Sequence, residues 1–209
     1  MHEELKEKLR QIDNNYDGKA FQAIINKVKK DKVSDEEILN LIEKISQKRF
    51  RERVSFNFSV FGGNMLEIIV TAAAIALVFQ AGADWMLYIG ALVLMTTLHP
   101  LSHYITGSLV GIKFTHYYLN GPARIEPTLR INYSTYLKAP AGSRALMHMS
   151  GVIGTVAAPL ILALIAISKG ASGAAVNLGI LFLLLIVFEL LTSTKIGDLM
   201  RAKREYGFK

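Results

Sequence analysis

The feature that most constrains this chain is a long stretch that is almost free of charge. From Val54 to Ile112 only Glu67 and Asp84 are formally charged, whereas residues 1–55 carry 24 of the chain's 41 formal charges. A soluble core of ordinary size does not need so long a run without charges. The charge distribution therefore excludes an ordinary soluble enzyme and predicts a membrane protein with a polar N-terminal segment.

Four apolar runs are each long enough to cross a bilayer, because about 20 helical residues span roughly 30 Å of hydrocarbon. They cover residues 65–82, 85–112, 145–167 and 174–194. The two short connections between runs hold one basic residue, Lys169, while segments 48–53 and 113–144 and the tail after residue 200 are basic. The positive-inside rule then predicts that both termini and the long middle loop are cytosolic.

The long loop, residues 113–143, carries alternating apolar side chains on both sides of the turn signal Asn120-Gly121-Pro122. This pattern predicts a short β-hairpin at the cytosolic membrane surface. Such a hairpin either covers helix ends or holds an extended peptide by edge pairing, and the sequence leaves both open. The predicted fold class is thus an all-α membrane protein: a four-span transmembrane helix bundle, residues 56–209, with a short cytosolic β-hairpin and an N-terminal helical module, residues 1–55.

The N-terminal module shows apolar side chains at helical spacing in three short segments. The stripes are Leu5, Leu9 and Ile12; Phe21, Ile24, Ile25 and Val28; and Ile38, Leu41, Ile42 and Ile45. Ser34-Asp-Glu-Glu37 is a capping box that opens the last helix. We interpret the module as a cytosolic unit for regulation or for self-association into a homo-oligomer.

Four lysines follow the second stripe: Lys27, Lys29, Lys30 and Lys32. Such a cluster is more often a solvated helix end than a site for lipid headgroups or nucleic acid. No nucleic-acid partner is expected. The expected partners are the lipid bilayer and a membrane protein or transmembrane peptide.

The chain has no cysteine, so disulfides, thiolate metal sites and cysteine nucleophiles are excluded. His99 and His103 are four residues apart on a predicted span and therefore share a helix face. Two imidazoles at this spacing are a common way for a helix to offer two ligands to one Zn²⁺. In the alternative interpretation the histidines only bond neighbouring carbonyls and make the bundle rigid.

Three segments carry a family resemblance. They are Thr97-Leu-His99-Pro-Leu-Ser-His103-Tyr-Ile-Thr-Gly107 with Leu109-Val-Gly-Ile-Lys113, then Met149-Ser-Gly151 with Pro159, then Thr192-Ser-Thr-Lys-Ile-Gly-Asp198. Together they resemble the site-2 proteases, intramembrane zinc metalloproteases with the pattern H-E-x-x-H, over roughly residues 85–204. The resemblance implies zinc bound by His99, His103 and Asp198, with a water completing the tetrahedron.

The chain departs from that family at position 100, where the catalytic glutamate is replaced by Pro100. Proline has no titratable group, and loss of a general base typically costs on the order of 10²–10⁴ in rate. Pro100 also removes a backbone donor, which predicts a helix kink beside the metal face. Asp198 reaches the depth of the histidines only if the segment 192–197 leaves the helix and folds back.

Two residues are candidates to replace the missing base or to carry protons. Glu126 lies in the hairpin loop, and His148, at the start of the third span, is a candidate for additional metal or proton chemistry. Glu67 and Glu189 are interpreted as paired with nearby cations or headgroups, and a continuous fourth helix would put Glu189 on the face opposite Asp198.

Three functions stay open. The first is a site-2-protease-like membrane protein that binds zinc and can bind transmembrane segments, but is impaired or inactive in proteolysis. The second is a membrane scaffold or adaptor with structural histidines, and the third is an active intramembrane metalloprotease with a rearranged base.

Overall fold

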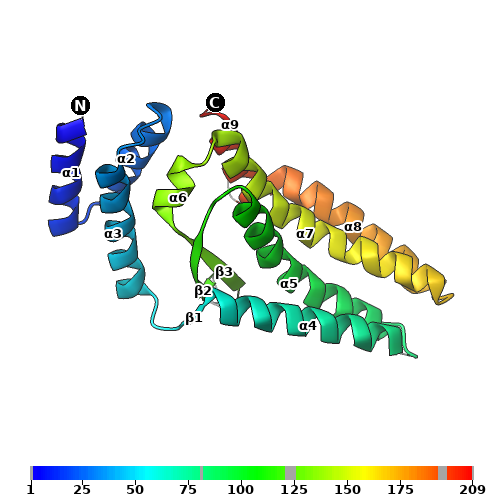
Figure 1. Ribbon diagram of the computed structural model, residues 1–209. Helices are drawn as coiled ribbons and strands as arrows, with labels where there is room; N and C mark the ends of the chain where they lie inside the picture. Colours follow the sequence, from blue (N-terminus) through cyan, green and yellow to red (C-terminus); the bar gives the residue numbers. More distant parts are fainter. Residues whose placement is uncertain (1, 81, 121–125, 193–196, 209) are drawn as a thin grey trace.

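A computed structural model of the chain describes residues 2–80, 82–120, 126–192 and 197–208 and is mostly helical (Figure 1). In chain order the elements are α1 (His2–Asn14), α2 (Gly18–Lys30), α3 (Glu36–Arg53), β1 (Asn57–Ser59), α4 (Val60–Gln80), α5 (Trp85–Leu109), β2 (Phe114–Asn120), β3 (Glu126–Ile131), α6 (Tyr133–Lys138), α7 (Ala141–Ser168), α8 (Ser172–Thr192) and α9 (Asp198–Tyr206).

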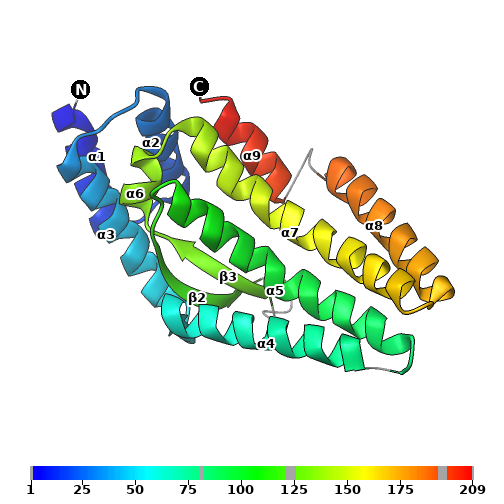
Figure 2. The same ribbon diagram turned by 45° about the vertical axis from the view of Figure 1, so that its right-hand side comes forward.

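The four long helices α4, α5, α7 and α8 lie side by side (Figure 2). Within the described residues, these are the four helices long and apolar enough to cross a membrane. Their outer faces expose large apolar side chains; Leu183 and Leu184 of α8, for example, are each 60% exposed. Exposed apolar surface of this extent is suited to lipid rather than water, so the bundle is consistent with an integral membrane protein.

A long apolar helix occurs at each of the four predicted spans, with shifted bounds. α5 ends at Leu109, not at residue 112, because Gly111 adopts φ +82° and the Ile112 N–H donates to the Gly107 carbonyl at 2.8 Å. This is a glycine-terminated helix end, in which the positive φ turns the chain away from the helix axis. The predicted fourth span ran to residue 194, and its last two positions lie outside the described residues.

α5 and α7 approach each other closely along a glycine of α7. A Cβ built on Gly154 would lie 2.6 Å from the Leu98 carbonyl oxygen of α5, closer than any side chain tolerates. Near the same crossing, the Ser150 hydroxyl lies 3.1 Å from the Ser102 carbonyl oxygen. Close backbone approach through small residues is a common way for membrane helices to associate. It fixes the histidine-bearing face of α5 against α7.

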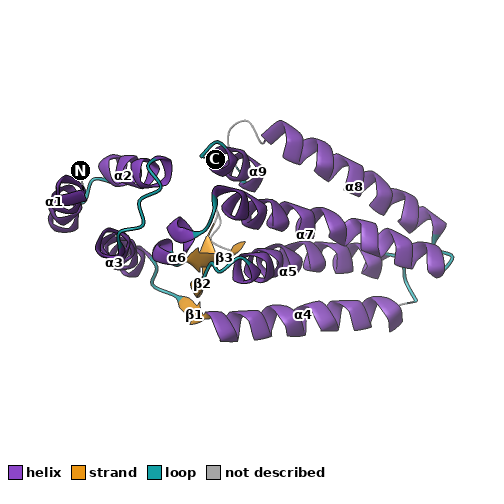
Figure 3. Ribbon diagram, turned by 45° about the horizontal axis from the view of Figure 1, so that its top comes forward, coloured by secondary structure: helices purple, strands orange, loops and turns teal. Residues whose placement is uncertain are grey.

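The predicted hairpin is present as part of a three-stranded antiparallel sheet of order β1-β2-β3 (Figure 3). β1 was not predicted, because three residues are too few to show an alternating pattern. The Tyr117 hydroxyl of β2 donates to Asn64 Oδ1 of α4 at 2.8 Å, which fastens the sheet to the bundle. Of the predicted turn, Gly121-Pro122 lies outside the described residues.

The N-terminal module consists of α1, α2 and α3, as the apolar stripes predict. Asp17 and Asp35 cap α2 and α3 by accepting backbone N–H bonds, so the cap of α3 is Asp35 and not Ser34. Its apolar core, with Ile38 and Ile42 fully buried, continues into Met147 of α7. The module is therefore packed against the bundle of long helices rather than attached by a linker alone.

The module, the sheet and both chain ends lie at one end of the long helices (Figures 1 and 2). We call this the sheet end. The α4–α5 and α7–α8 connections lie at the opposite end. The arrangement agrees with the charge pattern of the sequence, which groups the two termini and the middle loop on one side.

Candidate metal centre

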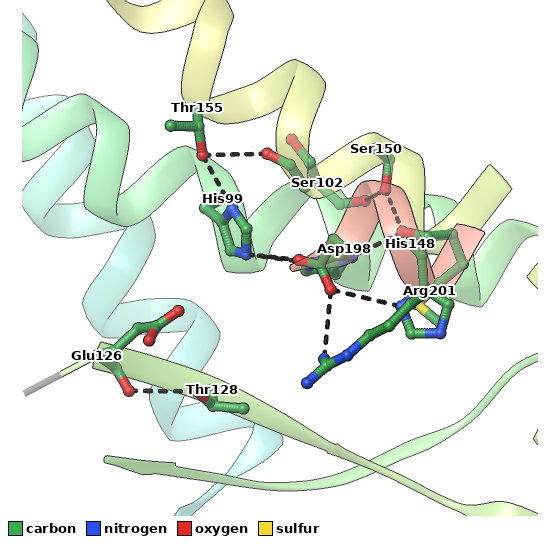
Figure 4. A network of polar contacts seen from close by, with 12 residues as sticks. His99, Ser102, Glu126, Thr128, His148, Ser150, Thr155, Asp198 and Arg201 are labelled. Atoms are coloured by element: carbon green, nitrogen blue, oxygen red, sulfur yellow. Dashed lines mark hydrogen bonds and ion pairs between the residues drawn. The ribbon is translucent and has the colours of Figure 1, made fainter. Parts of the chain in front are cut away.

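Two helices bring the predicted ligands together at the sheet end. His99 and His103 lie one turn apart on α5, and Asp198 is the first residue of α9 (Figure 4). Asp198 Oδ2 lies 2.9 Å from His103 Nε2 and 3.2 Å from His99 Nε2, and the two Nε2 atoms are 3.2 Å apart. Within the described part of the chain, this is the one group of three such side chains close enough to hold a metal ion.

The spacing of these three atoms matches a tetrahedral metal. Bonds of roughly 2.0–2.1 Å from zinc to nitrogen and oxygen imply ligand atoms about 3.3 Å apart. Two imidazole nitrogens and one carboxylate oxygen are also ligands that zinc accepts in sites that keep a fourth position for water. The residues present therefore fit zinc in both chemistry and spacing.

The second nitrogen of each imidazole is already engaged. His103 Nδ1 lies 2.6 Å from the Met147 carbonyl oxygen, which can only accept, so Nδ1 carries the hydrogen. His99 Nδ1 lies 2.9 Å from Thr155 Oγ1, whose own hydrogen is donated to the Gly151 carbonyl. With Nδ1 as the donor, each ring can present Nε2 as a lone pair to a metal. Three electron-rich atoms then converge, and they need a shared proton or a metal cation between them.

Asp198 uses its two oxygens differently. Oδ2 faces the Nε2 atoms, while Oδ1 lies 3.3 Å from Arg201 Nη1 and 3.6 Å from His148 Nδ1. Burial alone would raise the pKa of this carboxyl, but in the metal-free site hydrogen bonds from a protonated imidazole of His103, His148 or His99 hold the pKa well below its usual range. Asp198 is therefore ionised, with one oxygen available to a metal and the other held in place.

The three candidate ligands line a cavity of about 240 Å³ between α5, α7, α9, β2 and β3. Glu126 and Leu129 of β3 line it, together with Pro100, His148 and Arg201. β3 is an edge strand of the sheet and runs past the site on the side of Glu126 (Figure 4). An extended chain in this cavity would therefore lie beside both a strand edge and the candidate metal ligands.

In comparisons with protein-family models, with curated proteins and with solved structures, no match was found. The resemblance to site-2 proteases rests on the motif residues. The candidate metal centre rests on geometry alone.

Most of the predicted site residues meet at this place. The structure brings together His99, His103 and Asp198, sets His148 against Asp198, and puts Glu126 and Pro100 on the same cavity. α8 ends at Thr192 and α9 begins at Asp198, as the depth argument requires; residues 193–196 lie outside the described residues. α5 continues as a helix through Pro100.

The opposite-face placement of Glu189 assumed one continuous helix through Asp198. That condition is not met, because α8 ends at Thr192 and α9 begins at Asp198.

Sequence reasoning missed a buried ionic cluster next to the site. Lys29, interpreted as part of a solvated helix end, is 6% exposed and forms an ion pair with Glu205 of α9. Arg144 of α7 binds the other oxygen of Glu205 at 2.7 Å. Lys29 lies beside Val28 on the buried face of α2. Its helical spacing from the apolar residues of that face was the one sequence signal of its burial.

Gly151 gives a direct test of the site geometry. A Cβ at this position would meet the imidazole of His103 at Nε2, far inside contact distance. Gly151→Ala is expected to push the imidazole out of the site and lower zinc affinity at least about tenfold, comparable to losing a group that orients a ligand. The measurement is zinc competition with a chelator. Gly179→Ala, in α8 with open space at its Cβ, is the matched control and should leave the affinity unchanged; equal affinities in the two variants would contradict the geometry.

Proposed function

We propose that this protein is an integral membrane zinc-binding protein of the site-2-protease type that has lost efficient peptide hydrolysis. The observation that carries the proposal is the convergence of His99, His103 and Asp198 at the sheet end of four apolar helices. Ionisable residues within membrane spans are expensive to place and usually mark a site. The basic loops and termini support a cytosolic location of the sheet end.

The ligand set suits zinc. The second nitrogen or oxygen of each ligand also has a polar partner that holds the ligand in place, as in other metal sites. The Met147 carbonyl and the Thr155 hydroxyl orient the two imidazoles, while Arg201 and His148 hold the second oxygen of Asp198. Such outer partners fix ligand orientation in metalloproteins. When bound, zinc would supply Lewis acidity and lower the pKa of a coordinated water.

Position 100 argues for impaired hydrolysis. Pro100 lines the same cavity as the ligands but has no group that can accept a proton. A membrane-spanning partner whose unwound end pairs with the edge strand β3 fits the cavity. The proposed activity is therefore binding of such a segment at a zinc centre without rapid cleavage.

A second candidate function is slow proteolysis with Glu126 as the base, and one observation favours it. Glu126, which carries a carboxylate, lines the same cavity as His99, His103 and Asp198. If the protein binds no zinc, that result would support the scaffold role, in which the histidines are purely structural.

Cleavage of membrane-spanning peptides by the unmodified protein separates these functions. In proteoliposomes supplied with zinc, we expect no cleavage that depends on His99, because no base occupies position 100. The assay compares the parent with His99→Ala and Glu126→Gln. Cleavage lost in His99→Ala would contradict the proposal, and a further loss of about 10²–10⁴ in Glu126→Gln would assign the base.

A further inference from the structure

An ionic cluster buried at the sheet end joins three parts of the chain. Glu205 of α9 is 1% exposed and lies between Lys29 of α2 and Arg144 of α7, which are 6% and 4% exposed. Arg144 also donates to the Ala139 carbonyl at 2.5 Å. Each charge in the cluster is thus paired, as buried charges must be.

Lys29 gives the N-terminal module its own contact with α9. Removing one partner of a buried ion pair is strongly unfavourable, because the other charge is left without compensation in a poorly solvated place. Burial alone would raise the pKa of the Glu205 carboxyl, but the hydrogen bond and charge of Lys29, followed by Arg144, hold the pKa below its usual range. Glu205 is therefore a carboxylate that needs both cations.

The same face of α9 carries the metal ligand. Asp198 and Glu205 are seven residues apart in one helix, which is close to two full turns, so both side chains project from one face. α9 has nine residues, and helices this short are not stable in isolation. Its position depends on what holds its two ends: the histidines at Asp198, and Lys29 with Arg144 at Glu205.

A second chain of contacts runs from the cluster to Asp198. Lys29 Nζ lies 5.0 Å from the centre of the Tyr136 ring, and the Tyr136 hydroxyl lies 3.0 Å from His148 Nε2. His148 Nδ1 in turn faces Asp198 Oδ1 at 3.6 Å. Two chains of contacts therefore connect the module to Asp198. One runs through Glu205 and the helix α9, and the other runs through Tyr136 and His148.

We propose that the N-terminal module controls the metal centre by holding α9 through Lys29, with Glu205 as the positioning residue for Asp198. The inference rests on the proposed zinc binding. Displacement of the module would release Glu205 from Lys29, loosen α9 and withdraw Asp198 from the two imidazoles. Residues 1–55 would then act as a clamp on the site, so that a partner that pulls the module away lowers its zinc affinity.

The test compares the zinc affinities of Lys29→Met and Lys138→Met in the full-length protein. Lys138 of α6 also forms an ion pair with the module, through Glu36 at 2.6 Å, but it is not one of the two cations that bind Glu205. Lys29→Met is expected to lower zinc affinity about tenfold, the lower range for lost outer partners of a ligand, while Lys138→Met leaves it unchanged. Amide exchange of residues 198–206 should accelerate only in Lys29→Met.

A double-mutant cycle checks that Lys29 acts through Glu205. On a Glu205→Gln background, Lys29→Met should change zinc affinity by much less than it does alone, since coupled residues are not additive. Zinc affinity and α9 exchange unchanged by Lys29→Met would overturn this inference while leaving the zinc proposal intact. A parent protein that binds no zinc would overturn the proposed function itself, and the inference with it.

Discussion

Replacing His103 with alanine is expected to abolish stoichiometric zinc binding. The imidazole supplies one of three protein ligands, and its Nε2 lies 2.9 Å from Asp198 Oδ2 and 3.2 Å from His99 Nε2. Loss of a ligand should exceed the roughly 10- to 100-fold loss seen when only its hydrogen-bonding partner is removed. His99→Ala and Asp198→Ala are expected to behave in the same way.

Zinc content by mass spectrometry and affinity by chelator competition measure this effect in protein purified without a histidine tag. His116→Ala is the matched control, because His116 belongs to the sheet, lies 5.4 Å from the Phe50 ring between ring centres, and takes no part in the metal group. The control should retain full zinc content. If the three ligand variants retain as much zinc as the control, the ligand assignment is wrong.

Replacing Pro100 with glutamate is expected to create or raise zinc-dependent cleavage of membrane-spanning peptides by about 10²–10⁴-fold, the usual contribution of a general base. Pro100 lines the cavity beside both histidines, so a carboxylate there lies next to the metal centre. The exchange also removes a proline from the inside of α5, a residue about 3 kcal/mol less favourable than alanine in a helix.

Pro100→Gln is the control for that experiment. It makes the same improvement to the helix and has nearly the same shape, but it cannot accept the proton. Rates that are equal in the glutamate and glutamine variants, or a gain that survives His103→Ala, would show that the missing base is not what limits hydrolysis.

The sequence was sufficient for the features that depend on local pattern. Charge-free runs predict α4, α5, α7 and α8, and alternation predicts β2 and β3, because burial in lipid and in a pleated sheet each impose a regular spacing. The spacing of His99 and His103 predicts a shared face. Linking them to Asp198 needed the family resemblance, since a contact over 95 residues leaves no local trace.

The remaining features depend on tertiary contacts. Lys29 looks like any lysine at a helix end, and only the folded chain brings it to Glu205, 176 residues away. Likewise, helical spacing cannot relate the face of Glu189 to Asp198, because the two residues belong to separate helices, α8 and α9. The role of a charged residue such as Lys29 therefore depends on which residues pack against it in the folded chain.

X-ray absorption spectroscopy of the zinc-loaded, untagged protein tests the central claim most directly. We expect one zinc per chain with two imidazole nitrogens and carboxylate or water oxygens at about 2.0–2.2 Å, and loss of this zinc signal in Asp198→Ala. A protein without bound zinc, or a zinc whose surroundings do not change in Asp198→Ala and His103→Ala, would contradict the claim.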